Sequence, residues 1–555
     1  MSSAGSPRKT ENLTRNPGLE NAPDMLQSII VAVAELHIFD GDSGIFLLQS
    51  PRVEAALFKE SSYKYWLYVA DEDRKHVGQI VQPNMHATFS TSHRCLVWCF
   101  YDEKGRVYSW LLRFNDREMQ ERFKDAFVRA MYESLNESNF NAIKPEDQQY
   151  IISAYEEDVE MQDVESEEEE SDEEESESEE EDESEDESEN ESDADEFTRK
   201  KDRNKYLAVG SKNDRSFVVK GGAVGVFKHT NDDKLEFVAA IGDLAKPSGE
   251  TIAPSKVMLH EGDSSMVLLD EKDEHSLYKM DIEYGKIVDE WKVHDIIPVV
   301  NVVPTSKFAQ TTDEKTLIGI SHNSLYRIDP RLPDFKLVDN ERKQYTTKNH
   351  FTCAATDEKG HIALASEKGD VKLFDRLGIN AKTNLPNIGD PIIGIDVTAD
   401  GQWVIATCKQ YLLLIDTRLK GGDHEVKTGF EKSFPKDKKP KPRKLQLRPE
   451  HIEQMGVEVS FTPARFNVGT SETEKTIVTS TGPFVITWNF RRVKQGKTRD
   501  YLIKRYGEDV VADDFKYGGD RSIVVAFPHD VTAVKKQYLR APTRDALSPT
   551  KNVSL

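Results

Sequence analysis

The chain has 555 residues, with 99 Asp and Glu against 74 Lys and Arg, and a formal net charge of −25. This length allows about two to four domains. The four cysteines form no CxxC pair and no zinc-binding spacing, which argues against a disulfide scaffold and indicates reduced thiols. The apolar run at residues 29–34 is far shorter than the roughly 20 residues that cross a bilayer. We therefore expect a soluble cytoplasmic protein, with the nucleus as the alternative location.

The negative charge is concentrated in one acidic segment. Residues 156–196 contain 28 Asp and Glu and no Lys or Arg, which leaves 71 acidic and 74 basic residues elsewhere. Such a segment has almost nothing apolar to bury, so burial cannot repay the entropy of ordering it. We predict a disordered acidic linker at residues 151–202 and a disordered N-terminus at residues 1–24. A basic partner is expected for the segment, in another protein or in this chain.

Before the linker, residues 25–150 predict a small β domain closed by a helix. Strand-like alternating runs occur at residues 45–49, 65–70, 94–101 and 106–114. Asp116 is a predicted helix N-cap. It is followed at helical spacing by Met119, Phe123, Ala126, Phe127, Ala130 and Met131. An antiparallel sheet closed by one amphipathic helix predicts a pleckstrin-homology-like (PH-like) fold.

A domain of this kind binds phosphoinositides, binds peptides or serves as structure. Phosphoinositide binding needs clustered Lys and Arg near the first hairpin, and this region offers only Arg52 and Lys59. We favour protein docking or a structural role, with weak membrane or peptide binding as the alternative. Trp66, Trp98 and Trp110 are interpreted as core residues of the sheet rather than as a peptide groove.

After the linker, residues 203–540 contain a loose repeat of a strand, a turn and a second strand. The copies are residues 216–228, 265–281, 316–329, 361–375, 403–416, 476–489 and 522–536. Asp329, Asp375 and Asp416 end three copies and lie 46 and 41 residues apart, which is the pitch of a propeller blade. We predict a mainly β protein with a C-terminal WD40-like β-propeller of seven blades, six or eight being alternatives. Residues 541–555 are predicted to be a disordered tail.

A basic insertion at residues 432–448 separates the fifth and sixth copies. It holds eight basic residues and one acidic residue, and its prolines exclude a regular helix or a central strand. The sequence leaves open a solvated loop, a nuclear-import-like signal, a nucleic-acid contact or a receptor for the acidic segment. Nucleic acid is the weakest of these because no aromatic residues alternate with the charges and the acidic segment would compete.

No catalytic or cofactor pattern is found in the sequence. The motifs GxxxxGK[ST], GxSxG and HExxH do not occur, nor do two histidines at metal-ligand spacing. The glycine-rich run at residues 221–225 lies inside a strand-turn-strand copy, where a tight turn explains it. We therefore expect no enzyme activity, no cofactor and no metal.

Several long segments of the C-terminal half resemble those of a known family. They include NDRSFVVKGGAVGVFKHT (213–230), DSSMVLLDE (263–271), LYKMDIEYGKIVDEW (277–291), the run at 369–417, VSFTPARFNVG (459–469) and TIVTSTGPFVITWN (476–489). They resemble the vacuolar import and degradation protein family numbered twenty-seven, whose plant relatives are the defective-embryo-and-meristems proteins. The N-terminal half fits the PH-like domain of that family, in which an acidic linker is usual.

The resemblance implies a cytoplasmic protein linked to vacuolar import and to catabolite-induced degradation of gluconeogenic enzymes. Longer fungal members carry an additional N-terminal region, which we expect this sequence to lack. The resemblance therefore does not extend to any function of that region. We favour a non-enzymatic adaptor or scaffold whose propeller binds protein partners. The alternative is a nuclear acidic chaperone-like factor that shields basic proteins such as histones.

The predicted partner-binding face holds the loops around residues 375–386 and 408–410. Its candidate protein-binding residues are Arg376, Lys382 and Lys409, which stand beside strands in the segment that most resembles the family. The competing interpretation is that Arg376 only pairs with Asp375 or with a carboxylate of a neighbouring blade.

The acidic segment is also a predicted kinase substrate. Seven of its serines have Glu or Asp three residues later: Ser166, Ser171, Ser176, Ser178, Ser184, Ser188 and Ser192. This spacing is typical of substrates of a casein kinase II-type kinase, although composition alone explains part of it. We further expect the segment to fold back onto the basic insertion and to gate what the propeller binds. The alternative is two independently solvated charge runs.

Overall fold

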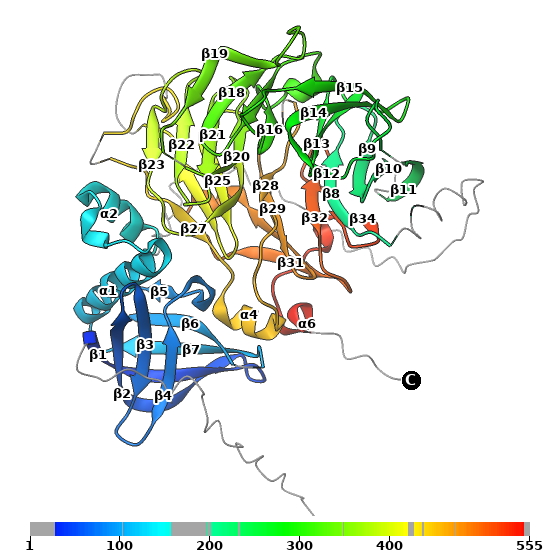
Figure 1. The fold of residues 1–555 in the computed structure, drawn as a ribbon. Coiled ribbons are helices and arrows are strands. Elements are labelled where there is room, and N and C mark those ends of the chain that lie inside the picture. Colours follow the sequence, from blue (N-terminus) through cyan, green and yellow to red (C-terminus); the bar gives the residue numbers. More distant parts are fainter. Residues whose placement is uncertain are drawn as a thin grey trace, which may run out of the picture.

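The computed structural model describes residues 28–102, 104–156, 197, 201–230, 234–242, 244–347, 349–419, 427–435, 438–470 and 472–548. The expected disordered N-terminus and most of the expected linker lie outside these residues. The described chain forms an N-terminal β domain beside a β-propeller, with helices α4 (Pro449–Met455) and α6 (Arg544–Leu547) at their junction (Figure 1).

The N-terminal domain is a seven-stranded antiparallel sheet in the order β4-β3-β2-β1-β7-β6-β5. Its strands are β1 Ser28–Asp40, β2 Ile45–Ser61, β3 Lys64–Ala70, β4 Lys75–Ile80, β5 Thr88–Ser90, β6 Cys95–Tyr101 and β7 Val107–Phe114. Its helical segments are η3 Pro83–Met85, α1 Arg117–Asn136, η4 Phe140–Ala142 and α2 Pro145–Ser153. This arrangement confirms the predicted PH-like fold.

Helix α1 begins and packs as the sequence predicts. The Asp116 side chain accepts a hydrogen bond from the backbone N–H of Met119 at 2.7 Å, which caps the first turn. Phe123 and Phe127 are fully buried against the sheet. The three tryptophans of the domain are buried as well, as expected for core residues. The four cysteines of the chain are buried, and none of them forms a disulfide in the described part of the chain.

The propeller has seven blades, which confirms the first choice made from the sequence. Blades one to three are β8 Asn204–Val209, β9 Arg215–Lys220, β10 Ala223–His229 and β11 Leu235–Ile241; β12 Pro254–His260, β13 Ser265–Asp270, β14 Asp273–Asp281 and β15 Lys286–Lys292; and β16 Asn301–Pro304, β17 Leu317–Ile320, β18 Ser324–Ile328 and β19 Leu337–Gln344.

Blades four to six also have four strands each, and blade seven has three. They are β20 Phe351–Thr356, β21 Ile362–Ser366, β22 Val371–Phe374 and β23 Thr383–Leu385; β24 Ile392–Val397, β25 Trp403–Cys408, β26 Leu412–Asp416 and β27 Arg443–Leu445; β28 Arg465–Phe466, β29 Thr476–Thr481, β30 Phe484–Asn489 and β31 Tyr501–Arg505; and β32 Ala512–Phe515, β33 Ser522–Ala526 and β34 Val531–Lys535. Short helices lie at η5 Ala309–Thr311, α5 Phe490–Lys494 and η6 Lys536–Tyr538. Each predicted copy coincides with the second and third strands of one blade.

Among the strands that the structure describes, none is shared between the first and last blades of the ring. The first strands of neighbouring blades contact one another around the ring, including β32 of blade seven and β8 of blade one. Asn204 at the start of β8 donates through its side-chain amide to the carbonyl oxygens of Phe527 at 2.8 Å and Asp530 at 3.2 Å. Val218 of blade one packs with Val524 and Val531 of blade seven. Side-chain packing and these polar contacts therefore hold the ring shut.

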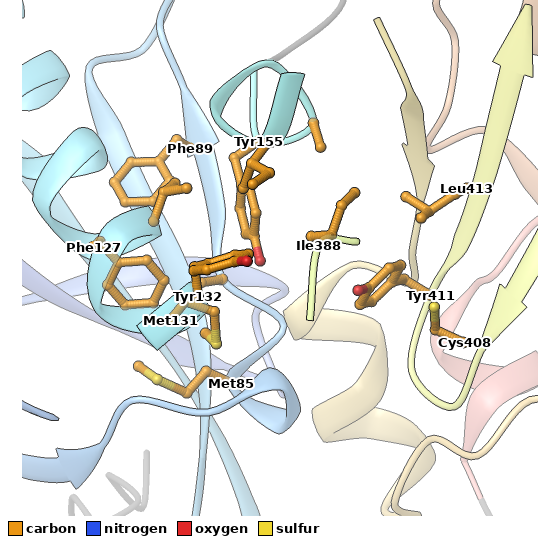
Figure 2. Packing of buried hydrophobic residues seen from close by; sticks show 14 of the residues in the cluster. Met85, Phe89, Phe127, Met131, Tyr132, Tyr155, Ile388, Cys408, Tyr411 and Leu413 are labelled. Carbon is orange, nitrogen blue, oxygen red and sulfur yellow. The ribbon is translucent and has the colours of Figure 1, made fainter. Parts of the chain in front are cut away.

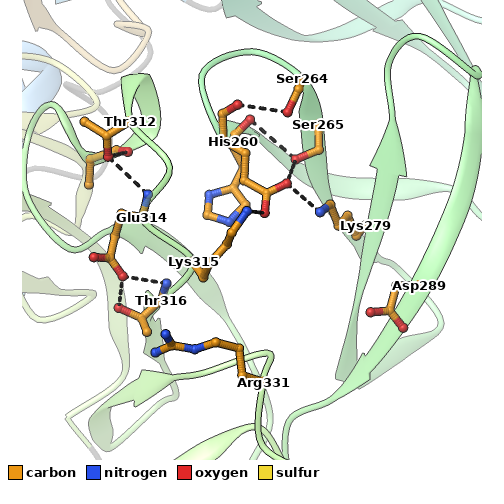
Figure 3. A network of polar contacts seen from close by, with 12 residues as sticks. His260, Ser264, Ser265, Lys279, Asp289, Thr312, Glu314, Lys315, Thr316 and Arg331 are labelled. Atoms are coloured by element: carbon orange, nitrogen blue, oxygen red, sulfur yellow. Dashed lines mark hydrogen bonds and ion pairs between the residues drawn. The ribbon is translucent and has the colours of Figure 1, made fainter.

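Polar networks also join neighbouring blades. Glu261, after β12 of blade two, pairs with Lys279 at 2.5 Å and with Lys315, which precedes β17 of blade three (Figure 3). Burial would raise the pKa of Glu261, but the two lysines outweigh it and hold the pKa at about 2. This carboxylate is therefore ionised at neutral pH and links two blades.

The structure differs from the expected linker and tail at three places. Residues 151–156 belong to the N-terminal domain, where Ile151 and Tyr155 are buried. Phe197 is buried on blade one, with its ring 5.8 Å from that of Phe237. Beyond residue 541, helix α6 buries Leu547 against the sixth blade. In each case a large apolar side chain finds a partner far away in the sequence, which local composition does not reveal.

Candidate functional site

The two domains share a continuous apolar core. Tyr132 and Tyr155 of the N-terminal domain belong to the same buried cluster as Ile388 and Tyr411 of the propeller (Figure 2). A second cluster joins Cys99 of β6 to residues of α4 and of the fifth and sixth blades. Burial on this scale is typical of the interior of one folded unit. The N-terminal domain is therefore packed onto the propeller.

Hydrogen bonds between the domains surround this core. The Tyr132 hydroxyl donates to Asn387 Oδ1 at 3.2 Å, and Asn387 Nδ2 donates to Asn136 Oδ1 at 2.7 Å. Gln446, directly after β27, donates to Thr88 Oγ1 and to the carbonyl oxygen of His86. These bonds satisfy polar groups that burial would otherwise leave without water.

Two histidines at this interface are held neutral. Burial, with a smaller contribution from Lys444, lowers the pKa of His86 to about 3. Burial and the nearby Arg448 lower the pKa of His451, in α4, to about 4. Both imidazoles are therefore uncharged at neutral pH, which suits their place between two packed surfaces.

The basic insertion forms part of this interface. Its residues 443–445 are β27, the outermost strand of blade five, and this outer position is compatible with the prolines before it. The Lys444 ammonium lies 4.4 Å from the Tyr155 ring centroid and 4.2 Å from that of Tyr411. Burial lowers the pKa of Lys444 to about 8. The solvated-loop interpretation is therefore wrong for this half of the insertion, because tertiary packing recruits it.

A cleft of about 1300 Å³ opens beside the interface. Its walls come from α1 and β5 of the N-terminal domain, from the end of the basic insertion and from the connection between β30 and β31. The basic side chains in its lining are Arg117, Lys124, Lys444, Arg448, Arg492, Lys497 and Arg499. The acidic ones are Glu121, Glu156, Glu450 and Asp500. The lining therefore carries an excess of three positive charges.

Several of these charges already neutralise one another. Arg117 lies 2.8 Å from Glu121, Arg492 lies 2.5 Å from Asp500, and Lys124 lies 3.8 Å from Glu156. Arg448 and Lys497 form no ion pair with any residue in the described part of the chain. These two cations leave the cleft with unbalanced positive charge, which can attract an anion.

The sequence offered a signal for the wall of the cleft that we did not use. Residues 489–500, NFRRVKQGKTRD, hold five Lys and Arg and a single Asp. Arg492, Lys497 and Arg499 of this run line the cleft together with Arg448 of the insertion. Two basic runs that each looked isolated in the sequence meet in space.

The three predicted partner-binding residues do not share one face. Arg376 and Lys382 lie in the connection between β22 and β23, where Arg376 is exposed. Lys409 lies in the turn between β25 and β26 and is 3.4 Å from Glu458. Because strands alternate in direction within a blade, the turn after the second strand and the connection after the third are at opposite ends. The single face predicted from the sequence is therefore wrong.

The competing pairing of Arg376 is not seen either. No ion pair joins Arg376 to Asp375 or to another carboxylate among the residues that the structure describes. The seven candidate phosphorylation serines lie outside the described residues. Within those residues, no group of three His, Cys, Asp or Glu is placed to hold a metal ion. None of the helices described there is long and apolar enough to cross a membrane.

The matches to known families cover both domains. Residues 202–553 match the family described as the VID27 C-terminal WD40-like domain, and residues 27–134 match the VID27 PH-like domain. This chain belongs to the VID27 family. Membership confirms the resemblance seen in the sequence.

Two relatives named vacuolar import and degradation protein 27 align with nearly the whole of this chain. The one from Schizosaccharomyces pombe is 48% identical over 564 residues, which cover 98% of this chain and 70% of the relative. The one from Saccharomyces cerevisiae is 36% identical over 571 residues, which cover 98% and 72%. A solved propeller domain of Cps50 (Swd1) from Myceliophteria thermophila is 10% identical with a TM-score of 0.41, covering 60% of this chain and 96% of that one. That likeness is too weak to build on.

Proposed function

We propose that this chain is a non-enzymatic scaffold in vacuolar import and degradation and that its propeller binds protein partners. The supporting observation is the alignment of 98% of the chain with two relatives that carry that name. A rigid propeller that displays its connections around a ring suits protein binding, because loops held by a stable framework need little ordering on association.

The partner contacts that we propose lie on both faces of the propeller. Arg376 and Lys382 present two cations on one face, beside the outer strand of blade four. Lys409 lies on the other face. Both side chains of its ion pair with Glu458 are exposed to solvent. Because exposed pairs contribute little energy, a partner carboxylate can compete for this lysine.

The test is affinity purification with the full chain. We expect Arg376→Glu/Lys382→Glu, or Lys409→Glu, to lose partners that the unchanged chain recovers. The matched control is Lys286→Glu/Lys359→Glu, two exposed lysines that form no ion pair among the described residues. Recovery of the same partners by both test variants, at unchanged thermal stability, would exclude these contacts.

We propose a mainly structural role for the N-terminal domain, since it packs so extensively on the propeller. Of the two cations near its first hairpin, Lys59 lies 3.9 Å from Glu133 and 5.4 Å from the Tyr65 ring centroid, so its charge is partly engaged. Sedimentation with phosphoinositide vesicles tests the alternative of weak membrane binding. If the chain sediments with the vesicles and Lys59→Glu abolishes this sedimentation, weak membrane binding is favoured.

Cellular location distinguishes the scaffold from the nuclear chaperone-like alternative. We propose a cytoplasmic location, and the acidic segment is the feature that favours the alternative. Imaging of a tagged full chain tests both. Exclusion from the nucleus would reject the chaperone, whereas nuclear accumulation together with histone binding would reject the cytoplasmic scaffold.

A further inference from the structure

We propose that the acidic segment binds in the cleft between the two domains through its residues 157–196. The site consists of described residues, and its occupant is a part of the same chain. The sequence suggested the basic insertion as receptor, but that insertion supplies only one wall of the cleft. This inference does not depend on the proposed scaffold function.

The point at which the segment leaves the folded domain supports this location. Glu156, the first residue of the acidic segment, lines the cleft. Its carboxylate lies 3.8 Å from the Lys124 ammonium and 3.9 Å from that of Lys441. Lys124 belongs to the N-terminal domain and Lys441 to the basic insertion of the propeller, so the acidic segment begins between one cation of each domain.

Charge complementarity is the second support. Residues 157–196 hold 27 Asp and Glu and no Lys or Arg, whereas the cleft has unbalanced cations at Arg448 and Lys497. One exposed ion pair is worth little. A tethered segment, however, presents many carboxylates at an effective concentration in the millimolar range, so successive carboxylates can replace one another at the same cations.

The dimensions of the cleft agree with an extended polypeptide. Small-molecule sites usually span about 300–1,000 Å³, and this cleft is larger, at about 1300 Å³. Ser166 and Ser171 follow Glu156 by 10 and 15 residues. At about 3.3 Å per extended residue, both can reach any wall of the cleft. Phosphate on either serine would strengthen binding, because Arg binds phosphate through two parallel hydrogen bonds.

Photo-crosslinking of the full chain tests this proposal. All four natural cysteines are buried, so a thiol introduced by Ser171→Cys can be labelled selectively with a benzophenone maleimide. After irradiation, mass spectrometry locates the crosslinks. We expect them within residues 117–124, 444–450 and 492–499. We expect their yield to fall about fivefold or more in Arg448→Glu/Lys497→Glu, since attraction becomes repulsion at two positions.

The matched control is again Lys286→Glu/Lys359→Glu, which should leave the yield unchanged. A second measurement leaves the cleft residues unchanged and raises the salt to 1 M, which shortens the Debye screening length to about 3 Å. The crosslinking yield should fall similarly. Crosslinks that survive both the cleft reversal and high salt would overturn the proposal. So would crosslinks mainly between two chains, which would indicate an acidic segment of another molecule as the occupant.

Discussion

Glu453 of helix α4 accepts a hydrogen bond from the backbone N–H of Ser109 in strand β7, with a separation of 2.5 Å between the two atoms. The two residues are 344 positions apart in the chain. Burial raises the pKa of Glu453 to about 7. A carboxyl group with a raised pKa thus lies between the propeller helix and the N-terminal sheet.

The first prediction concerns the pH dependence of this contact. Because the pKa of Glu453 rises from 4.5 to about 7 on folding, its contribution is fully present below about pH 4.5 and is lost as the pH rises through about 7. Glu453→Gln keeps an oxygen acceptor without the charge. We expect this variant to be more stable than the unchanged chain above pH 7, by about 1 kcal/mol, and to lose the difference near pH 5.

Urea unfolding between pH 5 and pH 8.5 measures this difference. Glu450→Gln, on the same helix, is the control for removing one negative charge. If both variants shift stability equally at every pH, the assignment to Glu453 fails.

The second prediction uses two glycines with positive φ. Gly389 has φ +128°, and a Cβ there would lie 2.8 Å from Leu135 Cβ and 2.9 Å from Asn136 Nδ2 of α1. Gly456 has φ +65° and nothing within 4 Å of such a Cβ. Gly456→Ala should cost about 1–2 kcal/mol of backbone strain. Gly389→Ala should cost about 1–3 kcal/mol more, because α1 must move away from the propeller.

Thermal unfolding and limited proteolysis compare the two glycine variants. Only Gly389→Ala should expose new cleavage sites at the domain interface. Equal stability losses with identical cleavage patterns would show that the close approach of α1 and the propeller contributes nothing to the stability of the domain interface.

The third prediction concerns closure of the propeller ring. The Asn204 amide donates to two carbonyl oxygens of blade seven. Asn204→Ala leaves these acceptors unsatisfied and should cost about 1–3 kcal/mol. Asn204→Asp should be worse, since a carboxylate replaces the donor beside two carbonyl oxygens. Thermal unfolding measures both, with the exposed Asn340→Asp as control. Asn204→Asp unfolding at the temperature of the unchanged chain would contradict this view of closure.

The fourth prediction is phosphorylation of the acidic segment by a casein kinase II-type kinase. We expect phosphate on Ser166, Ser171, Ser176, Ser178, Ser184, Ser188 or Ser192, each adding about −1.5 to −2 charge at neutral pH. Mass spectrometry of protein from growing cells checks this. Ser43 is exposed and is followed three residues later by Phe46, so it should stay unmodified. Seven unmodified serines would reject the prediction.

The features that the sequence alone predicted correctly depend on neighbouring residues. Asp116 caps α1 because the cap and the N–H that it accepts are three positions apart. The blade repeats were visible because an apolar strand, a turn and a second strand that ends in a polar or charged residue recur along the sequence. The family resemblance rested on the same local runs and predicted both domains.

Tertiary structure alone decided how the two domains meet and how the two basic runs at residues 432–448 and 489–500 come together. Ser109 and Glu453, or Thr88 and Gln446, are hundreds of residues apart, and no local pattern encodes such pairs. The prediction of one face for Arg376 and Lys409 failed because the face depends on strand direction within the blade. The cleft likewise arises only when α1, β27 and the connection after β30 converge. Packing of apolar surface between the domains brings these elements together, and that packing depends on the whole chain.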